Sequence, residues 1–141
     1  MDVADRLAIQ DLYARYNVAL DTGDEAGWVA CFTDDGVFDG RAPARGREEL
    51  AQYHRDRMAA RASEPFTNPQ HWNNNLLLRG EPPEVQAFSY VLRLGTMRAD
   101  GSIQIVRVAA YRDRLVKVDG RWRIARREVS FEQVPHDRIW G

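Results

Sequence analysis

The 141-residue chain contains a single cysteine, Cys31, and only three histidines. One cysteine excludes an intrachain disulfide, and so few sulfur ligands exclude a cysteine-based zinc cluster. No apolar run approaches the length of a membrane span. The acidic start Met-Asp-Val-Ala-Asp-Arg lacks the apolar region of a secretory signal. We therefore expect a cytoplasmic protein that neither spans a membrane nor binds a metal.

The sequence also lacks a strong net charge. Its 20 basic and 21 acidic side chains leave a formal charge of −1. Proteins that bind nucleic acid or anionic membranes usually carry a marked positive excess, so we expect neither partner. The hydrophobic fraction of 44% and the length suit one globular domain, residues 1–141, with its own core.

The sequence lacks the short motifs that are typical of phosphate-binding, serine hydrolase and zinc sites. The chain has no Gly-rich phosphate loop, no Gly-x-Ser-x-Gly elbow and no His-Glu-x-x-His metal helix. Cys31 lies in an apolar segment, which does not favour a nucleophilic thiolate. We therefore expect a small-molecule substrate and no cofactor.

The first half of the chain predicts helices. Apolar residues recur at helical spacing in the first segment and form an amphipathic stripe that includes Tyr13 and Tyr16. Gly23 can take the left-handed conformation that ends a helix, and Asp24 is a favourable N-cap for the next one. The expected helices are 5–20, 25–32 and 47–61, with a turn at 33–36, a short strand at 37–39 and a loop at 63–69.

The second half predicts strands rich in β-branched and aromatic residues. Asp100-Gly101 and Asp119-Gly120 suit tight hairpin turns because both positions tolerate positive φ angles. Gly95 is a candidate position for a bulge in a long strand. The expected strands are 71–78, 85–97, 103–118 and 121–134.

Helices followed by antiparallel strands predict an α+β fold. We expect a cone-shaped α+β barrel, in which a strongly curved, mostly antiparallel sheet wraps on the N-terminal helices around an internal pocket. Concave apolar pockets of this kind are the usual sites for small molecules.

Polar residues occupy positions of the predicted strand 71–78 at which buried hydrophobic residues are expected. Alternation places His71, Asn73 and Asn75 on one face together with Leu77. Buried polar groups need partners, so this face is either exposed to solvent or the polar wall of a pocket. The residue pattern leaves both readings open. His54 and His136 are expected at the surface.

Asp21 falls at the rim of the first helix's apolar stripe. It can cap backbone groups in the Asp-Thr-Gly-Asp turn, or it can take a catalytic role. Tyr13 and Tyr16 are expected as core aromatics whose hydroxyls lie at the edge of the core.

Three groups of motifs carry a family resemblance: residues 9–16, 19–21 and 32–36; residues 71–75; and residues 111–115 and 119–124. On these motifs the chain, from Arg6 to Phe131, resembles the SnoaL-like group of the nuclear transport factor 2-like superfamily. The nearest functional pattern is that of scytalone-dehydratase-like and bile-acid-dehydratase-like enzymes. The same sheet also occurs in the non-catalytic small subunits of ring-hydroxylating dioxygenases.

The resemblance implies a site made of Tyr16, Asp21 and His71, in which aspartate and histidine pair inside the cone. Phe131 stands about where the bile-acid enzyme has an arginine, so that substrate class is not implied. A tyrosine or asparagine could donate a hydrogen bond to an enolate oxygen, and aromatic residues could form an apolar wall. The expected substrate-binding residues are Tyr13, Trp28, Trp72, Asn73, Asn75, Phe88 and Tyr90.

Imidazole titrates nearest neutral pH and suits general acid–base work. The resulting hypothesis is a cofactor-free lyase or isomerase, of dehydratase type, acting on a small hydrophobic cyclic oxygenated substrate and forming a dimer or trimer. Two alternatives stay open: a non-catalytic ligand-binding or assembly subunit, and a polyketide cyclase.

Overall fold

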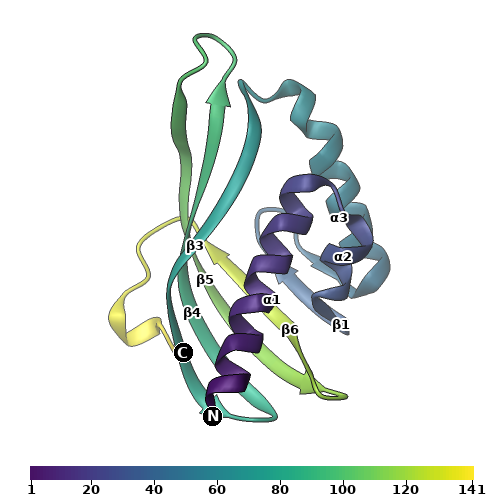
Figure 1. The fold of residues 1–141 in the computed structure, drawn as a ribbon, viewed down its shortest axis with the longest axis vertical. Helices are drawn as coiled ribbons and strands as arrows, with labels where there is room; N and C mark the ends of the chain where they lie inside the picture. The colour runs from purple at the N-terminus through teal and green to yellow at the C-terminus, as the bar shows by residue number, and fades with distance from the viewer.

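The structure, a computed structural model, describes all 141 residues. Three helices lie on one side of a six-stranded sheet, and the strands curve around them (Figure 1). None of the helices combines the length and the apolar character needed to cross a bilayer. The elements are α1 (Val3–Thr22), α2 (Glu25–Ala30), β1 (Phe32–Asp39), β2 (Ala44–Arg45), α3 (Gly46–Ala60), β3 (Phe66–Glu81), β4 (Glu84–Met97), β5 (Ile103–Val118) and β6 (Arg121–Ser130), with short 3₁₀ turns at Arg61–Ser63 and His136–Arg138.

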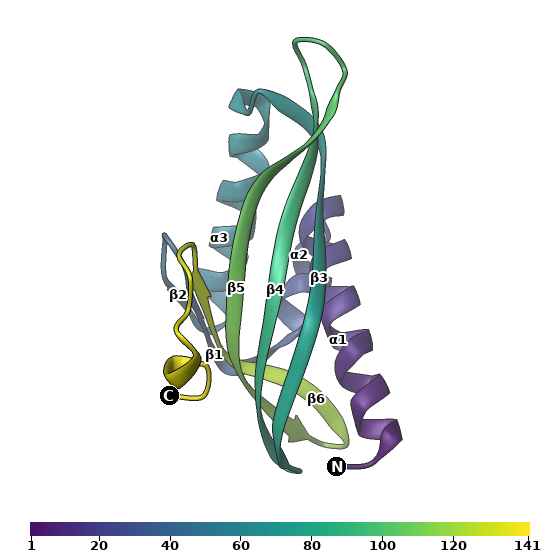
Figure 2. The same ribbon diagram turned by 90° about the vertical axis from the view of Figure 1, so that its left-hand side faces the viewer.

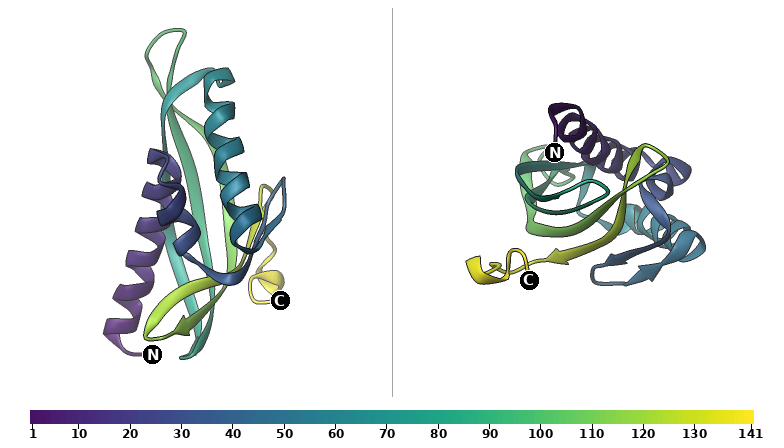
Figure 3. Two further views of the ribbon diagram at one scale, coloured as in Figure 1. Left: turned by 90° about the vertical axis from the view of Figure 1, so that its right-hand side faces the viewer. Right: turned by 90° about the horizontal axis from the view of Figure 1, so that it is seen from below.

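The sheet has the order β2-β1-β6-β5-β4-β3, and only the β1–β6 pair is parallel. Figure 2 shows β3, β4 and β5 as long neighbouring strands, and Figure 3 shows from below how the sheet bends around the helices. The predicted α+β fold with a strongly curved, mostly antiparallel sheet is thereby confirmed.

The ends of the first two helices follow from their capping residues. Gly23 takes a φ of 82° at the end of α1, and the Asp24 side chain accepts a hydrogen bond from the Gly27 backbone N–H at 2.9 Å. Both features were expected, because glycine adopts the left-handed conformation easily and aspartate is a good N-cap. The apolar stripe of α1 buries Ile9, Leu12 and Tyr16 in a single hydrophobic core. Strands β1, β4, β5 and β6 also contribute buried residues to this core, whereas β3 does not.

Several predicted boundaries are wrong. The segment 33–36 belongs to β1 instead of forming a separate turn, and β3 already begins at Phe66, inside the predicted loop. The second helix ends at Ala30 and the last strand at Ser130. Phe66 pairs with Met97 and so extends β3, while Phe32 and Val37 pair with β6 on either side of an irregularity at 33–36. Local sequence does not reveal these distant partners.

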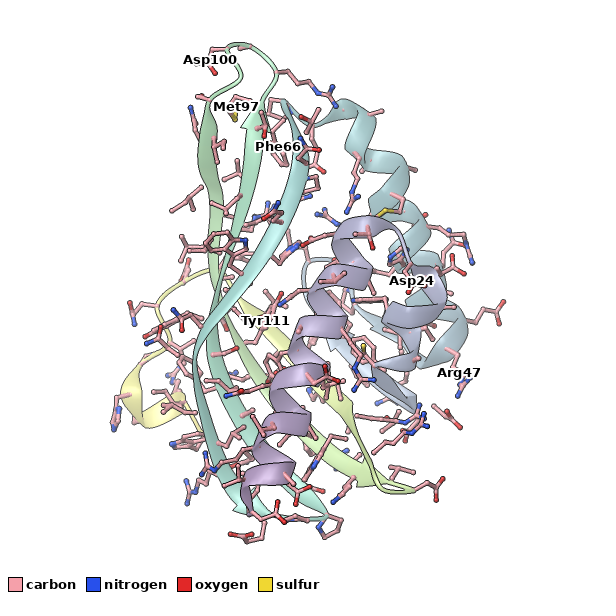
Figure 4. All side chains as sticks on the ribbon, viewed as in Figure 1. Asp24, Arg47, Phe66, Met97, Asp100 and Tyr111 are labelled. Carbon is pink, nitrogen blue, oxygen red and sulfur yellow. The ribbon has the colours of Figure 1, made fainter.

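Gly95 marks a bend, although the bulge itself is one residue away. The β4–β5 register shifts between Arg93 and Leu94, where β5 has an extra residue. A Cβ on Gly95 would lie 2.5 Å from the Phe66 ring, so glycine lets β3 pack tightly on β4. Figure 4 shows Phe66 beside Met97, near the protruding β4–β5 hairpin that carries Asp100.

Candidate active site

His71 and Asp21 meet between β3 and the last turn of α1. The Nδ1 atom of His71 lies 2.6 Å from one carboxylate oxygen of Asp21, and the His71 backbone N–H donates to the other at 2.8 Å. Both side chains are nearly buried. A carboxylate only accepts hydrogen bonds, so Nδ1 carries the proton and the Nε2 lone pair stays free.

Arg61 fixes the helix end that carries Asp21. Its guanidinium donates to the backbone carbonyls of Asp21 at 2.6 Å and of Leu20 at 2.7 Å. These contacts satisfy carbonyls that a helix C-terminus otherwise leaves without partners. The Asp21 carboxylate is therefore used to hold His71 and not to cap the turn.

His71 lines a cavity of about 150 Å³ between the sheet and the helices, while Asp21 lies behind it. Ten of its sixteen lining residues are hydrophobic, and none is acidic. The lining residues are Tyr16, Leu20, Phe38, Gly40, Arg41, Ala42, Tyr53, Arg57, His71, Val91, Arg93, Arg107, Ala109, Tyr111, Val129 and Phe131.

Tyr16 lines this cavity and has an unused hydrogen-bond donor. Its side chain is fully buried, and its hydroxyl has no hydrogen-bond partner. Burial, reinforced by Tyr111, raises the pKa of the Tyr16 phenol well above its ordinary value, although Arg127 acts in the opposite direction. The phenol therefore stays protonated. Because a buried hydroxyl without a partner is costly, this atom is suited to a ligand oxygen.

An ion pair lies beneath Tyr16. Arg127 donates to both carboxylate oxygens of Asp113, at 2.9 and 2.7 Å, and both side chains are fully buried. Burial alone would lower the pKa of Arg127, but the Asp113 charge raises it well above its ordinary value. The guanidinium lies 4.2 Å from the Tyr16 ring centre and 3.9 Å from that of Tyr111.

Tyr13 belongs to this buried network and does not line the cavity. Its hydroxyl donates to Asp113, and Arg127 lies 4.8 Å from its ring centre. The prediction that Tyr13 contacts substrate finds no support at this cavity, because its hydroxyl is already bonded to Asp113 and the residue does not line the cavity.

The four predicted aromatic wall residues are also outside the cavity. Trp72 and Tyr90 lie on the outer sheet face, 58% and 43% exposed, and Phe88 packs edge to face on Tyr90 at 5.4 Å. Trp28 is fully buried behind Tyr53, with ring centres 5.5 Å apart. Strand alternation and depth in the core, which composition does not reveal, account for these positions.

Asn73 and Asn75 do not line the cavity either. Asn73 lies next to His71 and donates to the Ser89 hydroxyl and the Tyr90 carbonyl, both at 3.1 Å. Asn75 is exposed at a bulge, with a φ of 56°, and the β3–β4 register shifts there. The bulge reverses the alternation, so Leu77 points outward and the prediction of one continuous polar face was wrong.

Most of the cavity's polar lining was not predicted from the sequence. Tyr53, Tyr111 and the four arginines Arg41, Arg57, Arg93 and Arg107 come from four separate elements. Arginine is abundant throughout the chain, so no local pattern distinguishes these four. His54, expected at the surface, is buried, and its Nε2 atom lies 3.2 Å from the Ala19 carbonyl oxygen.

Other chemistries find little support in the side chains. No group of three or more His, Cys, Asp or Glu residues is placed to hold a metal ion. Burial raises the pKa of the Cys31 thiol to about 11, so the thiolate is scarce at neutral pH.

The buried Tyr111 predicts a loss of stability in alkali. Burial raises its pKa to about 12 in the folded chain, against about 10 when unfolded. A raised pKa means that the stabilisation is complete below pH 10 and is lost as the pH rises towards 12. The loss from this residue is about 3 kcal/mol.

Urea unfolding at several pH values between 9 and 12 measures this effect. Tyr111→Phe is expected to reduce the fall in unfolding free energy, whereas Tyr90→Phe on the exposed outer face serves as the control. An identical pH dependence in Tyr111→Phe and the unmodified protein would contradict the prediction.

Comparisons with known proteins agree with the fold. The family model described as SnoaL-like domain matches residues 1–128. No protein with curated annotation matches the chain. Rv3472, a protein of unknown function from Mycobacterium tuberculosis, is 32% identical with a TM-score of 0.79, over 96% of this chain and 76% of that one.

Two further solved structures are similar. A protein from Catenulispora acidiphila is 34% identical, with a TM-score of 0.76, over 90% of this chain and 91% of that one. A Novosphingobium aromaticivorans protein, provisionally named a scytalone dehydratase, is 23% identical with a TM-score of 0.74, over 94% and 91% of the two chains. At that identity the last likeness concerns the fold alone.

Proposed function

The chain belongs to the SnoaL-like domain family of the nuclear transport factor 2-like superfamily, and from this premise we propose that it is a cofactor-free lyase or isomerase of dehydratase type. The substrate class is a small cyclic ketone with a hydroxyl group on the carbon next but one to the carbonyl carbon, that is, a β-hydroxyketone.

One observation carries the proposal: the His71–Asp21 pair adjoins a cavity that Tyr16, whose buried hydroxyl has no partner, also lines. With Nδ1 held by Asp21, the other ring nitrogen can act as a general base. A base and a neutral donor at one cavity are the groups that enolate chemistry requires.

The reaction begins when Nε2 of His71 takes the proton from the carbon beside the carbonyl. The Tyr16 hydroxyl donates to the carbonyl oxygen as it becomes an enolate, and Asp21 stabilises the imidazolium. When the enolate collapses, the carbon–hydroxyl bond breaks and Nε2–H gives its proton to the departing hydroxide. One water and one conjugated enone leave, and the imidazole is neutral again. Return of the proton to a different carbon would instead give an isomer.

Tyr16→Phe tests the role of the donor. Because the hydroxyl has no partner in the free protein, its loss is expected to leave the unfolding free energy unchanged or to raise it by about 1 kcal/mol. Turnover is expected to fall about 10²- to 10³-fold, as for other oxyanion donors.

A panel of cyclic β-hydroxyketones, followed by the absorbance of the conjugated enone, measures turnover. Tyr13→Phe is an informative comparison, because its hydroxyl bonds Asp113 and not a ligand, so stability is expected to fall and chemistry to persist. Equal turnover by Tyr16→Phe and the unmodified protein would remove Tyr16 from the mechanism. No enone from any member of the panel would count against dehydration.

A further inference from the structure

The cavity that contains His71 is strongly basic in a chain whose net charge is −1. Arg41, Arg57, Arg93 and Arg107 line it, and no aspartate or glutamate does. Only one of these four, Arg93, has an ion-pair partner: it donates to both carboxylate oxygens of Glu64, at 2.7 and 3.0 Å. Three guanidinium charges are therefore left without a carboxylate.

The positions of these arginines show that the charge is concentrated. The Arg41 and Arg107 guanidiniums lie 4.5 and 5.0 Å from the centre of the same Phe131 ring. Burial, together with repulsion from Arg41, Arg57 and Arg93, lowers the pKa of Arg107. Like charges gathered in a partly buried site cost free energy unless a counter-ion neutralises them.

Arg93 adds a donor within the cavity wall. It is only 5% exposed, and its Nε atom is buried without a hydrogen-bond partner, because Glu64 engages only the terminal nitrogens. A buried N–H without a partner is costly, and an oxyanion is the ligand that guanidinium groups bind best.

We propose that the substrate of this cavity carries an oxyanion, a carboxylate or a phosphate, which Arg57 and Arg107 bind while its apolar ring lies against the hydrophobic lining beside His71. The inference names the substrate class of the site and in that respect rests on the proposed function. The anionic group anchors one end of the molecule, and the reacting carbon is presented to the imidazole.

Calorimetric binding of matched aromatic probes tests the inference without any turnover. The probes are 2-naphthoate, its neutral methyl ester and 2-naphthyl phosphate. The two anions are expected to bind about 10- to 100-fold more tightly than the ester, since charge-assisted hydrogen bonds to arginine exist only for the anions. The stronger of the two anions identifies the group.

Arg107→Gln and Arg57→Gln are each expected to weaken binding of the anions about tenfold and to leave binding of the ester unchanged. Arg79→Gln, on an exposed part of β3 away from the cavity, is the matched control and is expected to change nothing. Raising the NaCl concentration from about 50 to 500 mM is expected to weaken binding of the anions but not of the ester.

An ester that binds as tightly as the acid, or anion binding no tighter than about 1 mM, overturns the inference. Anion binding and enone formation are measured separately, so the inference and the proposed function can fail independently. Arginine-dependent anion binding without enone formation upholds the basic site and rejects the lyase. Enone formation by a protein that binds the ester as tightly as the anions upholds the lyase and rejects the basic site.

Discussion

Replacing His71 by alanine is expected to lower kcat/KM by about two to four orders of magnitude on any hydroxyketone that the protein dehydrates. The imidazole is the only group at this cavity that combines a free basic nitrogen with a fixed orientation, since Asp21 holds Nδ1 at 2.6 Å. The remaining catalysis would come from Tyr16 and from substrate positioning.

The same substitution is expected to change the unfolding free energy by only about 1 kcal/mol, because one side-chain hydrogen bond is lost and the backbone contact to Asp21 stays. Asp21→Asn, which keeps the shape but removes the charge that stabilises imidazolium, is expected to lower kcat more than it changes KM. His136→Ala, in an exposed 3₁₀ turn, is the control. Full activity in both His71→Ala and Asp21→Asn would refute the mechanism.

Replacing Arg127 by alanine is expected to destabilise the fold by about 3–5 kcal/mol. The change leaves the buried Asp113 carboxylate without its cation and opens a void beneath the rings of Tyr13, Tyr16 and Tyr111. Uncompensated charge and lost packing act in the same direction.

Urea unfolding measures this loss against Arg114→Ala, which breaks an ion pair whose side chains are each 53% exposed. Exposed pairs contribute only about 0–1 kcal/mol, so the control is expected to change little. The double variant Arg127→Met/Asp113→Leu removes both charges. Its loss of unfolding free energy is expected to be smaller than the sum of the losses in the two single variants. Equal losses for Arg127→Ala and Arg114→Ala would contradict the role assigned to the buried pair.

The fold was predictable because its strongest signals are local. Helical periodicity, the Gly23 stop and the Asp-Gly hairpins predicted most element types and the order of helices before strands. The errors lie where tertiary pairing overrides propensity. The early start of β3 depends on the pairing of Phe66 with Met97, and the continuity of β1 across 33–36 depends on the pairs that Phe32 and Val37 make with β6.

The candidate site was predictable only in part. The resemblance indicated Tyr16, Asp21 and His71, and the structure brings the last two into contact and places the first on the same cavity as His71. The surrounding wall was not predictable, because the bulge at Asn75 reverses which β3 residues point inward. The four cavity arginines come from a loop, a helix and two strands, and no sequence spacing joins them.

The mechanism requires His71 to remove a proton from the carbon beside a carbonyl. Incubating the protein in D₂O with a cyclic β-hydroxyketone and following deuterium at that carbon by NMR tests this step directly, before any water is lost. The mechanism predicts exchange that depends on the protein, disappears in His71→Ala and persists in His136→Ala. Exchange at the same rate in His71→Ala would contradict it.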